Sequence, residues 1–128
     1  MTKELLKYIN DCLDGANVPY EFMVWTKGLS FPFFTGEYTE ETPLTEDGLE
    51  QGTFILTGTT NSSWYELETY KETIKNLFPD TAETAILTNG SGVAVSFSNS
   101  FPVPTGEQGL HRIQINLNYK EWKVNTNV

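Results

Sequence analysis

The sequence predicts an α+β fold in which two α-helices pack on one face of a single, mostly antiparallel β-sheet. Two segments carry apolar residues at helical spacing, and five others are rich in β-branched and aromatic residues. Three of these five lie close together at the end of the chain, separated by turn-forming residues, which favours antiparallel pairing. The predicted order is helix, strand, strand, helix, strand, strand, strand. We expect one domain over residues 1–128, since this length suffices for one core and no linker or repeat interrupts it.

The first helix is predicted over residues 3–14, because apolar residues recur there every three or four positions and Gly15 follows as a stop. After Pro19, the run VPYEFMVW is rich in β-branched and aromatic residues. This composition predicts a strand over residues 20–26.

The next segment, KGLSFPFFTGEYTEETPLTEDGLEQ, mixes glycines and prolines with acidic and aromatic residues. It predicts an extended loop or a ragged hairpin, with a short strand around residues 33–38. Its phenylalanines either fold back onto the core or dock on a partner chain, since exposed aromatic side chains are costly without a partner.

The second helix is predicted after a strand over residues 51–60. Apolar residues from Trp64 to Phe78 form a stripe, and Pro79 ends the helix because proline cannot donate a backbone hydrogen bond. Ser63 and Glu66 match the capping-box pattern, in which the two side chains satisfy free N–H groups of the first turn.

A hairpin is predicted near the end of the chain. Residues 85–88 form one arm, NGSG forms the turn, and the alternating Val93, Val95 and Phe97 form the other arm. The sequence FPVPTGEQG then predicts a loop.

The final strand is predicted over residues 110–124, and Asn125–Val128 are expected to form a loose tail. Its apolar residues are odd-numbered up to Tyr119 and even-numbered from Trp122. Because side chains alternate between the two faces of a strand, a bulge or sharp twist is expected near Lys120.

The composition excludes several classes of function. The net charge is −9 and no basic cluster exists, so tight binding of nucleic acid is not expected. The N-terminus is too polar for a signal peptide and no apolar run is long enough to span a membrane. The single cysteine, Cys12, is predicted to be a buried free thiol, in keeping with a reduced, cytoplasmic origin.

No catalytic or cofactor motif is found. His111 is the only histidine, lies at the start of a strand and has no nucleophile motif around it. One histidine and one cysteine cannot form a zinc site, and the acidic segment lacks the ligand spacing of a calcium loop. We therefore expect no enzyme activity, no metal and no cofactor. Three tryptophans, at positions compatible with the core, are expected to pack there: Trp25, Trp64 and Trp122.

Several phrases of the sequence resemble a family of known proteins. They are FTGEY, EDGLEQGTFILTG, IKNLFP, NGSGVAVSFSNSFPVPTGE and IQINLNYKEWKV. Together with the element order, they resemble small structural proteins of tailed phages and Gram-positive prophages, of the tail-terminator, tail-completion or head–tail joining class. The resemblance implies a helix-flanked antiparallel sheet, no enzymatic activity, and assembly into rings, commonly hexamers, in some cases only on a template. It also implies a virion protein that assembles in the host cytoplasm and contacts the tail-tube or head-connector protein.

The physical pattern suggests where such a ring would form its contacts. An acidic ring repels the phosphates of DNA passing through its channel. A ring needs head-to-tail contacts, for which the polar face of the last strand and the aromatic loop are suitable halves. The candidate interface residues are Phe31, Phe33, Phe34, Arg112 and Lys120. The alternatives are a small carbohydrate- or peptide-binding module that uses the aromatic loop, and an unrecognised hydrolase that uses acidic residues.

Overall fold

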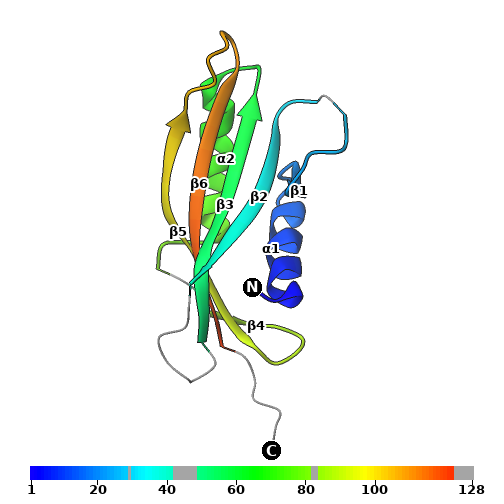
Figure 1. Cartoon of the computed structure of the whole chain (residues 1–128), viewed down its shortest axis with the longest axis vertical. Helices are drawn as coiled ribbons and strands as arrows, with labels where there is room; N and C mark the ends of the chain where they lie inside the picture. The colour runs from blue at the N-terminus through cyan, green and yellow to red at the C-terminus, as the bar shows by residue number, and fades with distance from the viewer. Residues whose placement is uncertain (29, 42–48, 82–83, 123–128) are drawn as a thin grey trace, which may run out of the picture.

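The computed structural model describes residues 1–28, 30–41, 49–81 and 84–122. Figure 1 shows the helices beside a long, twisted sheet. The elements in chain order are α1 (Lys3–Gly15), β1 (Tyr20–Phe22), β2 (Phe33–Glu41), β3 (Leu49–Thr60), α2 (Trp64–Leu77), β4 (Thr84–Ile86), β5 (Gly92–Val103) and β6 (His111–Trp122).

The sheet has six strands in the order β1-β2-β3-β6-β5-β4. Four of its pairings are antiparallel, and β1 pairs with β2 in parallel. The predicted α+β class, with two helices and a mostly antiparallel sheet, is therefore confirmed. The predicted order was wrong in one respect, because three strands precede α2. The segment around residues 33–38, expected to be a short strand in a loop, is a nine-residue strand inside the sheet.

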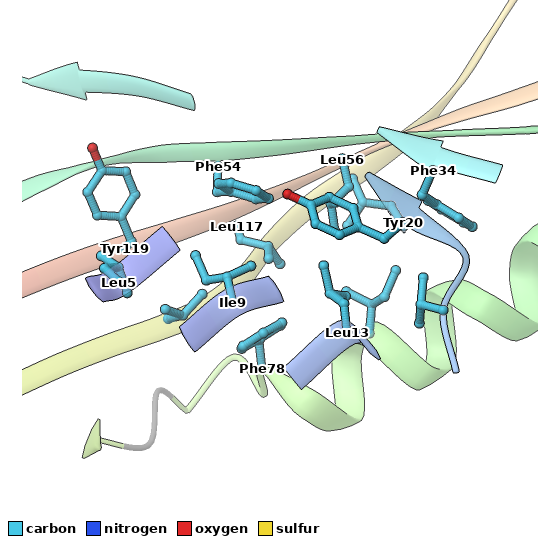
Figure 2. Packing of buried hydrophobic residues seen from close by; sticks show 14 of the residues in the cluster. Leu5, Ile9, Leu13, Tyr20, Phe34, Phe54, Leu56, Phe78, Leu117 and Tyr119 are labelled. Atoms are coloured by element: carbon cyan, nitrogen blue, oxygen red, sulfur yellow. The ribbon is translucent and has the colours of Figure 1, made fainter. Parts of the chain in front are cut away.

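Helix α1 follows the predicted pattern closely. Leu5, Ile9 and Leu13 form one fully buried stripe along it. Thr2 caps the helix, because its side chain accepts a hydrogen bond from the backbone N–H of Leu5. Figure 2 shows this stripe facing the aromatic and aliphatic side chains of the sheet.

Helix α2 begins without the predicted capping box. Ser63 occupies the N-cap position, but its side chain makes no capping hydrogen bond. The Glu66 carboxylate instead accepts a hydrogen bond from the hydroxyl of Thr60, at the end of β3. The tertiary contact with β3 replaces the local one that the sequence pattern indicates.

One face of the sheet supplies the strand residues of the core. Side chains alternate along a strand, so the register assigns the even-numbered residues of β2 and β3 and the odd-numbered residues of β6 to this face. These residues join the buried stripes of both helices in one cluster. The principal members from the sheet are Phe34, Phe54, Leu56, Ile113, Ile115, Leu117 and Tyr119.

Glycines let aromatic rings lie directly on the sheet. A Cβ atom on Gly58 would lie 2.3 Å from the Phe34 ring, and one on Gly52 would lie 2.6 Å from the Tyr119 hydroxyl. No side chain fits at either position, so the rings of the neighbouring strands cover the backbone there.

The final strand does not contain the predicted bulge. β6 pairs with β3 without interruption from His111 to Trp122, and the irregularity of this part of the sheet lies in β5, between Phe97 and Asn99. The odd-numbered face therefore continues to Glu121, which is fully buried, while Trp122 is 40% exposed. The prediction failed because the buried residue that continues the pattern is a glutamate.

Other element boundaries also differ from the prediction. β1 ends at Phe22, where the next residue, Met23, has a positive φ of 68°. β5 extends to Val103 and includes Phe101, which was assigned to a loop. The expected loose tail, Asn125–Val128, lies outside the described residues.

Candidate functional site

The second face of the sheet, called here the open face, contributes no residue to the buried core from its four long strands. It consists of odd-numbered residues of β2 and β3 and even-numbered residues of β6. Across these strands and β5, the face carries only two acidic and two basic side chains, Glu37, Glu41, Arg112 and Lys120. Most of the remainder is uncharged and polar: Thr35, Thr39, Gln51, Thr53, Thr57, Thr59, Ser96, Asn99, Gln114, Asn116 and Asn118.

Hydrogen bonds tie the amide side chains of this face together. The Gln114 side chain donates to Asn116 Oδ1 at 3.1 Å, and the Asn116 amide donates to Asn99 Oδ1 at 2.9 Å. The bonds run along β6 and across to β5. They leave a surface of polar groups that is ordered and nearly neutral.

One end of the open face combines aromatic and cationic groups. Phe33, Thr59 and Arg112 lie in register on three adjacent strands. Arg112 Nε donates to the Thr59 hydroxyl at 3.3 Å. The Phe33 ring stacks on Trp25, with centroids 5.3 Å apart, and contacts Phe31 at 5.6 Å. The structure thus brings Phe31, Phe33 and Arg112 to the same end of the sheet.

The other two predicted interface residues lie elsewhere. Lys120 is exposed on the open face, opposite Gln51 of β3. It is eight residues from Arg112 along one strand, which corresponds to about 26 Å. Phe34 is fully buried and makes an edge contact with Tyr70 of α2, so it belongs to the core and not to an interface. Because successive residues of a strand face opposite sides, Phe33 and Phe34 cannot share one surface.

The other side chains that could take part in catalysis lie in surroundings typical of structural residues. His111 is half-buried, and its ring makes an edge contact with Trp64, 6.4 Å away. Cys12 is a partly buried free thiol whose pKa is raised mainly by burial. A hydrogen bond from the Thr26 backbone lowers the pKa of the Glu21 carboxyl, and a hydrogen bond from Lys71 lowers that of Glu68. Both carboxyls therefore stay ionised, whereas a general acid needs a raised pKa.

Among residues 1–28, 30–41, 49–81 and 84–122, no group of three His, Cys, Asp or Glu side chains is arranged to hold a metal ion. No helix in the same part of the chain has the length and apolar character needed to cross a membrane.

Sequence reasoning missed two exposed apolar areas. Phe22, Met23 and Val24 follow each other at the β1 edge, and Val24 is 64% exposed. At the opposite edge, Ile86 of β4 is 73% exposed and lies beside Trp122 across Gly92. The sequence around both areas resembles that of ordinary buried strands. These side chains are exposed because β1 ends early and β4 is short.

No family model matches this chain, and no curated protein matches it. A solved structure superposes on it with a TM-score of 0.68 and 16% sequence identity, over 98% of this chain and 99% of that chain. At this identity the likeness establishes the fold alone. The same α+β architecture therefore occurs in a solved protein of nearly the same extent.

Proposed function

We propose that this protein is a non-enzymatic structural component of a tailed phage or prophage virion. It acts in tail completion or head–tail joining, and it assembles into a ring around the DNA channel. It contacts the tail-tube or head-connector protein and assembles in the cytoplasm of the bacterial host.

The observation that carries this proposal is the composition of the open face. A wide sheet surface with two acidic and two basic side chains, in a chain of net charge −9, offers no basic footprint to nucleic acid. Its ordered amide and hydroxyl groups suit contact with another protein surface or with a channel through which DNA must slide. The phrases that resemble phage neck and tail proteins support the same conclusion.

The edges of the sheet favour contacts through side chains over strand addition. The edge strands β1 and β4 have three residues each and cover only part of β2 and β5. The uncovered part of β2 carries exposed Glu37, Glu40 and Glu41, and that of β5 carries an irregularity and Pro102. Short edge strands, charges, bulges and proline all discourage pairing with a further strand. A ring built from this chain therefore uses its projecting side chains.

The experiment is light scattering after gel filtration over a range of protein concentrations, with the protein alone and with phage tail-tube protein. We expect a ring-sized species, either alone or on addition of the tube protein. A strict monomer that ignores the tube protein at the highest concentration would overturn the ring proposal.

A second candidate is a carbohydrate- or peptide-binding module. It is favoured by the contiguous Trp25, Phe31 and Phe33 rings, because aromatic faces stack on sugar rings and on proline. This module would be a monomer, and a glycan array together with a peptide screen would identify its ligand.

A further inference from the structure

The charged side chains of the open face are divided between two strands. Glu37 and Glu41 lie on β2, whereas Arg112 and Lys120 lie on β6. β3 runs between these two strands and contributes no charged side chain to this face. Figure 1 shows the three strands side by side along the length of the sheet. The face is therefore acidic on one side of β3 and cationic on the other.

The register places the outer residues of this pattern in matching rows. Glu41, Gln51 and Lys120 form one row across the three strands. The row that contains Phe33 and Arg112 lies eight residues away along each strand. In both rows the β6 residue is cationic, and the β2 residue is a carboxylate or an aromatic ring. Each of these β2 side chains can bind a cation.

Ile55 of β3 lies at the centre of this arrangement, four residues from each outer row. It shares its own row with Glu37 of β2 and Asn116 of β6. Between the outer rows, it is the only apolar side chain that the three strands present on this face, and it is half-buried. A contact in which β3 meets the β3 of a second copy would cover this side chain with its own counterpart.

We propose that two copies of this chain bind each other through their open faces, with a two-fold axis along β3. Because the axis exchanges the two sides of β3, β2 of each copy lies over β6 of the other. Glu41 then meets Lys120 of the second copy, and Ile55 meets its own counterpart on the axis. An axis along β2 would place glutamate over glutamate, and one along β6 would place lysine over lysine.

The remaining charges of the face also have suitable partners under this symmetry. Arg112 meets the Phe33 ring of the second copy, which allows a cation–π contact. Glu37 meets Asn116 of the second copy, whose side-chain amide can donate to the carboxylate. No charged side chain in these rows therefore faces a like charge.

Charged residues of neighbouring segments do not interrupt the rows. Glu21 lies on β1 beyond β2, and both of its carboxylate oxygens accept hydrogen bonds from Thr26. Lys27 lies in the loop after β1, with its Nζ 5.7 Å from the centre of the Trp25 ring. Glu107 lies in the turn beyond the ends of β5 and β6.

The ends of the contact require long side chains. Two aligned sheets cross at about 30°, so facing strands are displaced sideways at both ends. The outer rows carry such side chains, because Glu41, Lys120 and Arg112 can each reach across this displacement. The crossing also separates the two copies of Arg112, each of which extends over its own Thr59 toward the axis through the hydrogen bond of Nε.

The area of the face limits how strong the contact can be. Three strands about 4.8 Å apart, over a length of about 26 Å, bury on the order of 1,000 Å² in total when two copies meet. Specific protein contacts begin at about this size. We therefore expect a dimer that dissociates on dilution.

The dimer has a consequence for assembly, and this consequence alone rests on the proposed function. Each copy covers the open face of the other, so neither can present that face to a tail-tube or connector protein. Such a partner binds only after the dimer separates. The dimer would thus keep the open face covered until a partner competes for it.

The symmetry axis gives the first test, because a residue on the axis meets itself. Light scattering after gel filtration is measured for the protein alone over a range of concentrations, and we expect a dimer. Ile55→Asp and Ile55→Lys each place like charges on the axis and should raise the dissociation constant about tenfold or more. An equimolar mixture of I55D and I55K brings opposite charges together and should form dimers again. Circular dichroism verifies that both variants fold.

Charge exchange between β2 and β6 gives the second test. Glu41→Lys and Lys120→Glu each create two like-charge contacts and should weaken the dimer. The double variant E41K/K120E restores opposite charges and should recover it, as should a mixture of the two single variants. Glu72→Lys, at an exposed position of α2, is the control for the same change in net charge as E41K.

The outcomes distinguish this inference from the proposed function. A protein that stays monomeric at the highest concentration, or an assembly that I55D and E41K leave unchanged, would overturn the open-face dimer. A mixture of I55D and I55K that remains monomeric while both variants are folded would overturn the two-fold axis along β3. None of these measurements uses tail-tube protein, so capture of that protein tests the virion proposal separately.

Discussion

The Thr2 hydroxyl donates a hydrogen bond of 2.5 Å to the buried carboxylate of Glu121, and so joins the start of α1 to the end of β6. The same hydroxyl accepts from the backbone N–H of Leu5, and the Thr2 backbone N–H approaches Glu121 Oε1 at 3.4 Å. One side chain therefore caps the helix and supplies a hydrogen bond to a carboxylate that is removed from water. A buried charge is tolerated only where such partners exist.

Thr2→Ala should destabilise the protein by about 2 kcal/mol, because it removes the helix cap and leaves the Glu121 carboxylate short of one partner. Urea unfolding followed by circular dichroism measures this change. Thr69→Ala is the control, since the Thr69 hydroxyl only donates to the Tyr65 carbonyl of its own helix. Equal effects of the two substitutions would contradict the role given to Thr2.

Gly52→Ala should cost about 3 kcal/mol or prevent folding, because a Cβ atom there would lie 2.1 Å from the Thr39 carbonyl oxygen of the backbone. The Tyr119 hydroxyl donates to that same carbonyl at 3.0 Å, so the substitution also displaces this bond. Thermal unfolding provides the measurement. Gly15→Ala at the end of α1 meets nothing within 4 Å and should leave stability unchanged or raise it; a similar loss at both sites would refute the steric argument.

Hydrophobic periodicity was sufficient to predict both helices and the long strands β3 and β6. It failed where one residue departs from the pattern for a tertiary reason. Glu121 can lie on the buried face of β6 because Thr2 donates a hydrogen bond to its carboxylate. No feature of the neighbouring sequence indicates this contact. Ser63 resembles a cap, but Glu66 bonds to Thr60 of the preceding strand.

The candidate site was predictable only in part. Alternation alone separates Phe33 from Phe34, and strict use of it would have assigned Phe34 to the core. Phe33 and Arg112 are far apart in sequence, and only the order of strands β2, β3 and β6 brings them into one row. The exposure of Phe22, Met23 and Val24 was not predictable, because the positive φ of Met23 ends a strand that the composition would continue.

The two buried tyrosines predict a loss of stability at alkaline pH. Burial raises the pKa of both Tyr20 and Tyr119, so the folded state favours the neutral phenol. Since the folded pKa lies above the unfolded value of about 10, this stability is fully present below pH 10 and is lost as the pH rises above it. Urea titrations between about pH 8 and pH 11 measure the slope, and a flat profile would refute this assignment.

Phenylalanine variants separate the contributions of the two tyrosines. Within the described residues, the buried Tyr20 hydroxyl has no hydrogen-bond partner, whereas the Tyr119 hydroxyl is bonded. Tyr20→Phe should therefore be neutral or stabilising at pH 7, and Tyr119→Phe should cost about 1 kcal/mol. Each should reduce the alkaline slope.

The end of the open face that carries Phe33 and Arg112 should govern capture of the tail-tube or connector protein. Phe33→Ala removes a ring that stacks on Trp25, and Arg112→Glu reverses the one arginine of the chain. Both should weaken capture about tenfold, because aromatic and arginine side chains contribute most to protein contacts. Titration of labelled protein against tube protein measures the affinity.

Lys120→Glu, at the far end of the same strand, tells whether the effect belongs to this end or to the whole face. If F33A and R112E bind tube protein as tightly as the unmodified chain does, this end of the open face is not the site of capture.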